Sequence, residues 1–264
     1  MMARDLVLPS VPDGLRTPVE RARYVLEHYW DAMDWRDTTL TRDDMFMEQA
    51  SANFYSIFHV VDSVEASKAA AIMLAGASVD PYAYKKVADI AKIYLFEPES
   101  PIADDENYFV VADRLLADGK LPNSDLLRIA DSKRLAMMNR VGHKAADFEY
   151  VDRDGNISNL YEALKSHPKN ILMFYDPDCH VCAELEERLM ETLPDDTGVV
   201  MISPYGEQDG LWAEHAATMP ANWIVGRPTN EDFEDEDIYE LRTTPTVLMI
   251  DNHGVVLSKG KLEF

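Results

Sequence analysis

Apolar residues recur at intervals of three and four from Thr17 to about Val141, which is the spacing of one buried face on an α-helix. Residues that cap helices stand in front of several of these stretches. Thr17 precedes Pro18, and Thr41 with Asp44 resembles a capping box in which aspartate replaces the usual glutamate. Predicted helices begin at Thr17, Thr41 and Asp80 and occupy residues 104–118 and 123–140. The pattern predicts an irregular helical bundle without a strict internal repeat.

Short apolar runs separated by turns replace the helical pattern after Gly142, as in an α/β domain. The runs at 171–175 and 199–202 are continuously apolar, which is typical of central parallel strands covered on both faces. Further strands are predicted at 147–151, 246–250 and 255–257, the last two as an antiparallel edge, and helices at 160–166, 179–193 and 234–241. The sequence thus predicts two domains, a helical one over 1–141 and an α/β one over 142–264.

The chain is strongly acidic, with a formal net charge of -23 over 264 residues. Such a charge repels nucleic acid phosphates and anionic lipid headgroups. Charges also interrupt the most apolar stretches well before the roughly 20 residues that a membrane helix needs. We therefore expect no nucleic acid partner and no membrane insertion for the chain as given. The start, Met1-Met2-Ala3-Arg4, lacks the pattern of a secretory signal, so composition alone favours the cytoplasm.

The two cysteines of the chain, Cys179 and Cys182, are separated by two residues at the predicted start of a helix. Unpaired N–H groups at a helix start stabilise a thiolate, so Cys179 is the candidate attacking thiol. Cys182, one turn further on, can attack the resulting mixed disulfide and release the reduced partner. The alternative is a zinc half-site, but no second CxxC or His-x-His cluster supplies the other ligands that zinc needs. We expect neither a metal nor another cofactor.

Four segments of the second half, taken in order, carry a resemblance to a known family. They are 142–148 (GHKAADF), 154–156 (DGN), 171–182 with the cysteine pair, and 244–246 (TPT). Together they resemble the thioredoxin-like thiol-disulfide oxidoreductases of the ResA/TlpA class, whose fold is a central mixed sheet flanked by helices. The resemblance implies a cis peptide bond before Pro245 and a substrate site lined by Thr244 and Pro245, to which we add His180 between the cysteines. For the Thr-Pro-Thr segment alone, an ordinary turn or edge-strand proline is the alternative.

The sequence departs from this family beside the cysteines. Asp178 stands where most relatives have an aromatic residue, and Leu185 where many have a glutamate. We expect the carboxylates of Asp178 and Glu184 to oppose ionisation of the first thiol. His180 is a weak counterweight, because an ordinary imidazole is mostly uncharged at neutral pH. These charges predict a reductant or an isomerase rather than a disulfide donor.

The helical half has no motif that indicates a chemistry. It resembles the helical region of unknown function that precedes thioredoxin-like domains in some Gram-negative envelope proteins. This resemblance implies a periplasmic or cell-envelope location, whereas composition alone favours the cytoplasm.

The expected partners are a disulfide-bearing protein substrate and an upstream thiol donor. Two alternatives stay open, a non-catalytic redox sensor or adaptor whose helical domain binds a partner, and a peroxidase. The acidic run at 231–237 lacks the glycine and alternation of a calcium loop and is interpreted as solvated surface.

Overall fold

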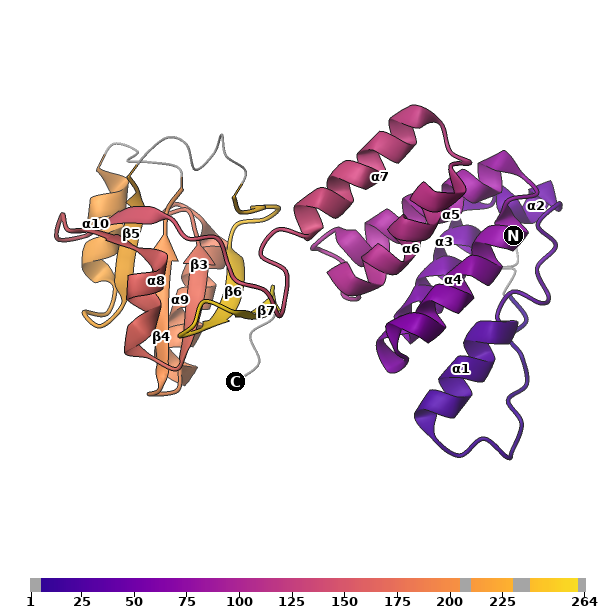
Figure 1. Ribbon diagram of the computed structural model, residues 1–264, viewed down its shortest axis with the longest axis horizontal. Coiled ribbons are helices and arrows are strands. Elements are labelled where there is room, and N and C mark those ends of the chain that lie inside the picture. Colours follow the sequence, from indigo (N-terminus) through magenta and orange to yellow (C-terminus); the bar gives the residue numbers. More distant parts are fainter. Residues whose placement is uncertain (1–5, 205–209, 230–237, 261–264) are drawn as a thin grey trace. The chain divides into compact units, whose positions relative to one another are not determined.

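The computed structural model describes residues 6–204, 210–229 and 238–260. The chain forms two compact units, Met1–Leu135 and Ala136–Phe264. The described part of the first unit is built of helices, and the described strands of the second form one sheet with helices packed on it (Figure 1). This architecture confirms the predicted fold class, a helical region followed by a mixed sheet flanked by helices. No described helix combines the length and the apolar character that a membrane span requires.

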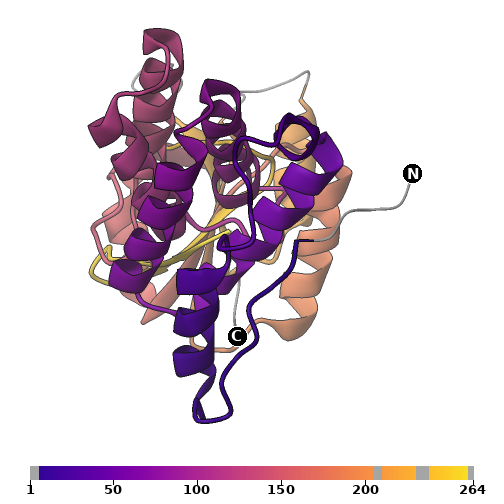
Figure 2. The ribbon, with the colours of Figure 1, turned by 90° about the vertical axis from the view of Figure 1, so that its right-hand side faces the viewer.

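Short polar side chains cap the backbone at the start of most helices of the first unit. They are α1 (Pro18–His28), α2 (Thr38–Thr41), α3 (Asp44–Ser56), α4 (Ser63–Ala77), α5 (Pro81–Ala91), α6 (Asp105–Asp118) and α7 (Asn123–Ala136), with a 3₁₀ turn η1 (Ile57–Val60) and a π turn η2 (Lys92–Phe96). Thr17 and Glu20 form a complete capping box on α1, and Asp80 and Asp104 cap α5 and α6. Figure 2 gives a second view of these helices, coloured indigo to magenta.

Two details of the predicted helices are wrong. Thr41 does not cap a helix but is the last residue of α2, and the side chain of Asp43 caps α3 by accepting a hydrogen bond from the Phe46 N–H. A carboxylate directly before the helix takes the role that the pattern gives to the threonine two residues earlier. On α1, the helical spacing of apolar residues predicts one buried face that includes Val19 and Leu26, but only Leu26 is buried and Val19 is 44% exposed.

The apolar pattern does not predict α4, although this helix has a buried face formed by Ala66, Ala69, Ala70, Met73, Leu74 and Ala77. Its side chains are mostly alanine and other apolar residues, so the sequence lacks the contrast between two faces that reveals an amphipathic helix. Asp62 caps it by accepting from two backbone N–H groups. Near its end, a side-chain carbon on Gly76 would overlap the indole of Trp35, so glycine lets the indole pack directly on the helix.

The sheet of the second unit has the order β2-β1-β5-β4-β3-β6-β7. Its strands are β1 (Glu149–Asp152), β2 (Ile157–Asn159), β3 (Lys169–Phe174), β4 (Thr197–Ile202), β5 (Ile224–Pro228), β6 (Thr246–Asp251) and β7 (Val256–Lys259). The central strands β3, β4 and β5 pair in parallel, and β6 and β7 form an antiparallel edge. Both features confirm what the apolar runs predict.

Three helices in the described part of this unit cover the sheet, α8 (Leu160–Ala163), α9 (His180–Thr192) and α10 (Leu211–Thr218), with a 3₁₀ turn η3 (Leu164–Ser166) after α8. Successive residues of β3 alternate between its two faces. Ile171 and Met173 belong to the core that α9 and α10 close, whereas Leu172 and Phe174 belong to the core on the side of α8. The fully buried central strand therefore separates two apolar cores.

Two elements of the second unit, α10 and β5, are not predicted from the sequence. α10 is short, and β5 contains Gly226 and Pro228, which weaken the pattern of a strand. The predicted helix at 234–241 falls partly outside the described residues, and its described part, 238–241, is not helical. The acidic run at 231–237 lies outside the described residues.

Candidate functional site

Cys179 is the residue that caps α9. Strand β3 ends at Phe174, and the turn that follows is held by Asp176, whose carbonyl accepts from the Cys179 N–H at 3.0 Å and whose carboxylate accepts from the Asp178 N–H at 2.9 Å. The chain then enters the helix at His180. This turn points the first cysteine at the N-terminus of α9, where backbone N–H groups have no helical partner.

Two backbone groups of the described chain are hydrogen-bonded to the sulfur of Cys179. It accepts from the Cys182 N–H at 3.2 Å, so a backbone donor of the first helical turn faces it. Its thiol also donates to the Thr244 carbonyl at 3.6 Å. The residue is partly exposed, so a sulfur with nearby N–H groups lies within reach of an external disulfide.

Cys182 is in a different environment, one helical turn deeper. It is 1% exposed and belongs to the core formed by β3, α9 and α10. Burial raises the pKa of its thiol to about 12, and the hydrogen bond with Cys179 acts in the same direction. The two thiols are thus adjacent but unequal, one accessible and the other held in its protonated form at neutral pH.

Thr244 and Pro245 reach the cysteines through the pairing of β3 with β6. The register places Thr246, the first residue of β6, opposite Phe174, the last residue of β3. The residues just before β6 therefore lie beside the turn that leads to Cys179. The peptide bond between Thr244 and Pro245 is cis. Segments about 65 positions apart in the chain are brought together by this register.

The other three residues assigned to the site from the sequence, Asp178, His180 and Glu184, are exposed. His180 Nδ1 lies 3.5 Å from Glu184 Oε1, one helical turn away, and both side chains are more than half exposed. Asp178 and His180 are the sequence neighbours of Cys179, and Glu184 contacts the His180 imidazole. Water screens the charges of the two carboxylates.

A buried polar cluster beside Cys182 is missed by the sequence analysis. Glu186 is 3% exposed, and its Oε2 accepts from His215 Nε2 of α10 at 3.1 Å. The other carboxylate oxygen has no hydrogen-bond partner among the described residues. The His215 ring lies 5.0 Å from that of Tyr175, whose pKa is raised by burial and by the Glu186 charge. The spacing of four residues on a helix could have predicted that Glu186 lies on the same face as Cys182. Its partner His215 could not have been found in this way, because α10 is not predicted.

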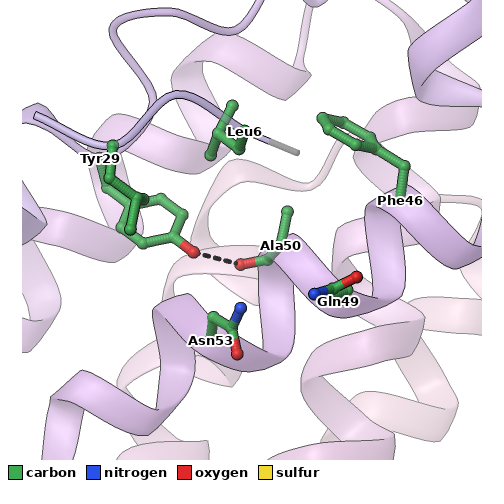
Figure 3. A pocket seen from close by; sticks show the side chains of 7 residues that line it. Leu6, Tyr29, Phe46, Gln49, Ala50 and Asn53 are labelled. Carbon is green, nitrogen blue, oxygen red and sulfur yellow. Dashed lines mark hydrogen bonds between the residues drawn. The ribbon is translucent and has the colours of Figure 1, made fainter. Parts of the chain in front are cut away.

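A pocket of about 320 Å³ lies in the helical unit. Figure 3 shows Tyr29 on one side of it, donating a hydrogen bond to the Ala50 carbonyl, and the amides of Gln49 and Asn53 on another. Its lining is otherwise apolar. These residues offer no nucleophile or titratable pair. Among the described residues of the whole chain, no group of three or more His, Cys, Asp and Glu side chains could hold a metal ion.

Two protein-family profiles match the chain. One, for the domain of unknown function DUF5106, covers residues 3–139, and the other, for a thioredoxin-like domain, covers residues 158–263. Among solved structures, a thioredoxin-like protein from Bacteroides caccae is 26% identical, with 99% of this chain and 96% of that chain covered and a TM-score of 0.87. No curated protein matches this chain.

Two further solved structures each match just under half of this chain. A conserved protein of unknown function from Bacteroides fragilis is 33% identical, with 47% of this chain and 93% of that chain covered and a TM-score of 0.42. The thioredoxin domain of a thiol-disulfide oxidoreductase from Bacteroides vulgatus is 17% identical, with 46% and 87% covered and a TM-score of 0.39. The DUF5106 profile spans just over half of the residues, and the Bacteroides caccae structure matches both units together. The chain belongs to the DUF5106 family and carries a thioredoxin-like domain after that helical domain.

Proposed function

We propose that this protein exchanges thiols and disulfides with partner proteins through Cys179 and Cys182. The observation that carries the proposal is the unequal placement of two adjacent thiols on a thioredoxin-like fold. Cys179 is partly exposed and accepts a backbone N–H at the start of α9, while Cys182 is buried one turn deeper. This division favours an attacking and a resolving thiol. A protein that serves only as an adaptor has no need of it.

In the proposed cycle, the Cys179 thiolate attacks a disulfide of the substrate protein, and one substrate sulfur leaves and takes up a proton. Cys182 then loses its proton and attacks the Cys179 sulfur of the mixed disulfide. The second substrate sulfur leaves and is protonated, so the substrate gains two electrons and the enzyme keeps a Cys179–Cys182 disulfide. An upstream thiol donor supplies the electrons that reduce this disulfide again.

The proposed substrate path runs past Thr244 and Pro245. The Thr244 carbonyl, 3.6 Å from the Cys179 sulfur, is a backbone acceptor to which an extended substrate segment can pair. His180 and Val181 are exposed next to the sulfur and supply the facing side chains. The direction we propose is reduction or isomerisation, and it is supported by Asp178 directly before Cys179, whose exposed, water-screened carboxylate adds a weak negative charge where a substrate approaches. The resemblance to envelope proteins supports a periplasmic location.

Reduction of insulin disulfides in the presence of dithiothreitol tests the proposal. The wild type is expected to accelerate the reaction over dithiothreitol alone, and Cys179→Ser is expected to abolish that acceleration. Glu191→Gln, an exposed change on the same helix, serves as the matched control and is expected to behave as the wild type. Absence of acceleration by the wild type would leave the redox sensor or adaptor as the better account.

A further inference from the structure

The backbone that leads to Thr244 has no helix or strand of its own. Residues 238–245 are described as coil before β6 begins at Thr246. The carbonyl of Thr244 nevertheless lies beside the Cys179 sulfur, at 3.6 Å. Strand β6 fixes the end of the segment, where the Thr246 hydroxyl donates to the Thr243 carbonyl. The residues before Thr243 need other contacts, because a coil without ladder hydrogen bonds has many conformations open to it.

Asn139 supplies one such hold. Its side-chain amide donates to the Ile238 carbonyl at 2.7 Å, and its side-chain oxygen accepts from the Ala146 N–H at 2.6 Å. The residue is 9% exposed, so both bonds are shielded from water. Its φ of 49° is the one positive value of a non-glycine residue in the described chain, and asparagine tolerates this region better than most side chains. A single amide thus joins the connector after α7 to the segment before Thr244.

Tyr239 also contacts Ala146, the residue that donates to the Asn139 side chain. Its hydroxyl donates to the Ala146 carbonyl at 2.6 Å, so Ala146 is bonded through both of its backbone groups. The tyrosine ring packs on Phe174, the last residue of β3, with ring centroids 4.8 Å apart. The segment is therefore held by a hydrogen bond and an aromatic contact one residue after the Asn139 bond.

The connector itself is fixed to the sheet and can act as a support. The Lys259 ammonium donates to the carbonyls of Ala136 and Met138 at 3.2 and 3.1 Å. The Gly142 N–H donates to the Val256 carbonyl at 2.8 Å. Asn139 lies between these two attachments to β7, so its backbone is anchored on both sides.

We propose that Asn139 is a positioning residue for the substrate site, holding residues 238–243 so that the Thr244 carbonyl stays beside Cys179 when a protein substrate docks. The inference rests on the proposed function. A small disulfide that meets only the Cys179 sulfur does not need the segment in place. Asn139 should therefore affect protein substrates and spare small ones.

The test compares two substrates on the full chain, insulin and the small disulfide 5,5′-dithiobis(2-nitrobenzoate). Asn139→Gly keeps the left-handed backbone without strain and removes both side-chain bonds. We expect it to lower kcat/KM for insulin roughly five- to tenfold, mainly through KM, because about one net hydrogen bond no longer holds the docking segment. The first thiol released from the small disulfide should keep the wild-type rate. Asn252→Gly, the same exchange at an exposed turn, should change neither reaction.

Hydrogen exchange supplies a readout that does not depend on activity. Amides of residues 238–244 should exchange faster in Asn139→Gly than in the wild type, with the strands unchanged. If the glycine variant does not fold, Asn139→Asp, which keeps an acceptor for Ala146 and loses the donor to Ile238, carries the same test. Equal losses with both substrates, or none with either, overturn the positioning role. A wild type that reacts with neither substrate instead refutes the proposed function.

Discussion

Replacing Glu186 by glutamine should slow the step in which Cys182 resolves the mixed disulfide. Burial raises the pKa of the Cys182 thiol to about 12 in the reduced protein, so little of it is ionised at neutral pH. Removal of its proton is therefore a barrier to the resolving step. A neighbouring proton acceptor reduces that barrier, and a positioned general base contributes about 10²- to 10⁴-fold to a rate.

Glu186 is suited to take this proton. It lies four residues after Cys182 on α9, a spacing that places the two side chains about 5–6 Å apart on one helix face, and helical side chains tilt toward the N-terminus. His215 holds one carboxylate oxygen at 3.1 Å, and the other has no partner among the described residues. Glu186→Gln keeps an acceptor for His215 and removes the capacity to take a proton.

Stopped-flow reaction of the reduced protein with 5,5′-dithiobis(2-nitrobenzoate) separates the two steps. The first thionitrobenzoate reports attack by Cys179, and the second reports attack by Cys182. At pH 7 we expect Glu186→Gln to slow the second phase about 100-fold and leave the first unchanged, with Glu191→Gln matching the wild type in both. The deficit should shrink as pH rises, because hydroxide then takes the proton. Equal second-phase rates for wild type and Glu186→Gln from about pH 6 to 9 would refute this reasoning.

Three further predictions concern stability and redox poise. The folded pKa of Cys182 exceeds its unfolded value of about 9, so its contribution to stability is complete below pH 9 and is lost between about pH 9 and 12. In denaturant titrations of the reduced protein, the free energy of unfolding should therefore fall more over this pH range for the wild type than for Cys182→Ala. Asp178→Asn should make the protein more oxidising in a glutathione equilibrium, by at most about fivefold, since a unit charge at 4 Å is worth about 1 kcal/mol in water. Gly76→Ala should destabilise the helical unit by about 1–3 kcal/mol in thermal unfolding, because the new methyl group overlaps Trp35; an unchanged melting temperature would contradict that packing.

Much of the site can be predicted because its main parts lie where local signals are strong. A CxxC pair follows a continuous apolar strand, and Thr244-Pro245 stands directly before another. The register of β3 with β6 brings these two segments together. Local patterns do not predict this proximity, which is expected only from the family resemblance. The charged residues beside the cysteines illustrate the limit, because sequence does not tell that Asp178 and Glu184 are exposed and screened.

The parts that escape sequence analysis depend on contacts between distant elements. The partner of Glu186 is His215, 29 positions away on a short helix with a weak apolar pattern. The role of Asn139 requires a left-handed backbone and an acceptor 99 positions later. For α4, apolar residues on its exposed face, such as Val64 and Ile72, hide the periodicity of its buried face. In each case the missing information is tertiary packing, which periodicity does not encode.

The most direct test of the account is the identity of the cysteine that forms a mixed disulfide. Cys182→Ser is incubated with insulin, quenched by alkylation, and analysed by mass spectrometry, with Cys179→Ser treated in parallel. The account predicts a covalent adduct on Cys179 in the first variant and none on Cys182 in the second, because Cys182 is 1% exposed and its thiol stays protonated. An adduct that forms on Cys182, or no adduct on Cys179, would contradict the central claim that Cys179 attacks and Cys182 resolves.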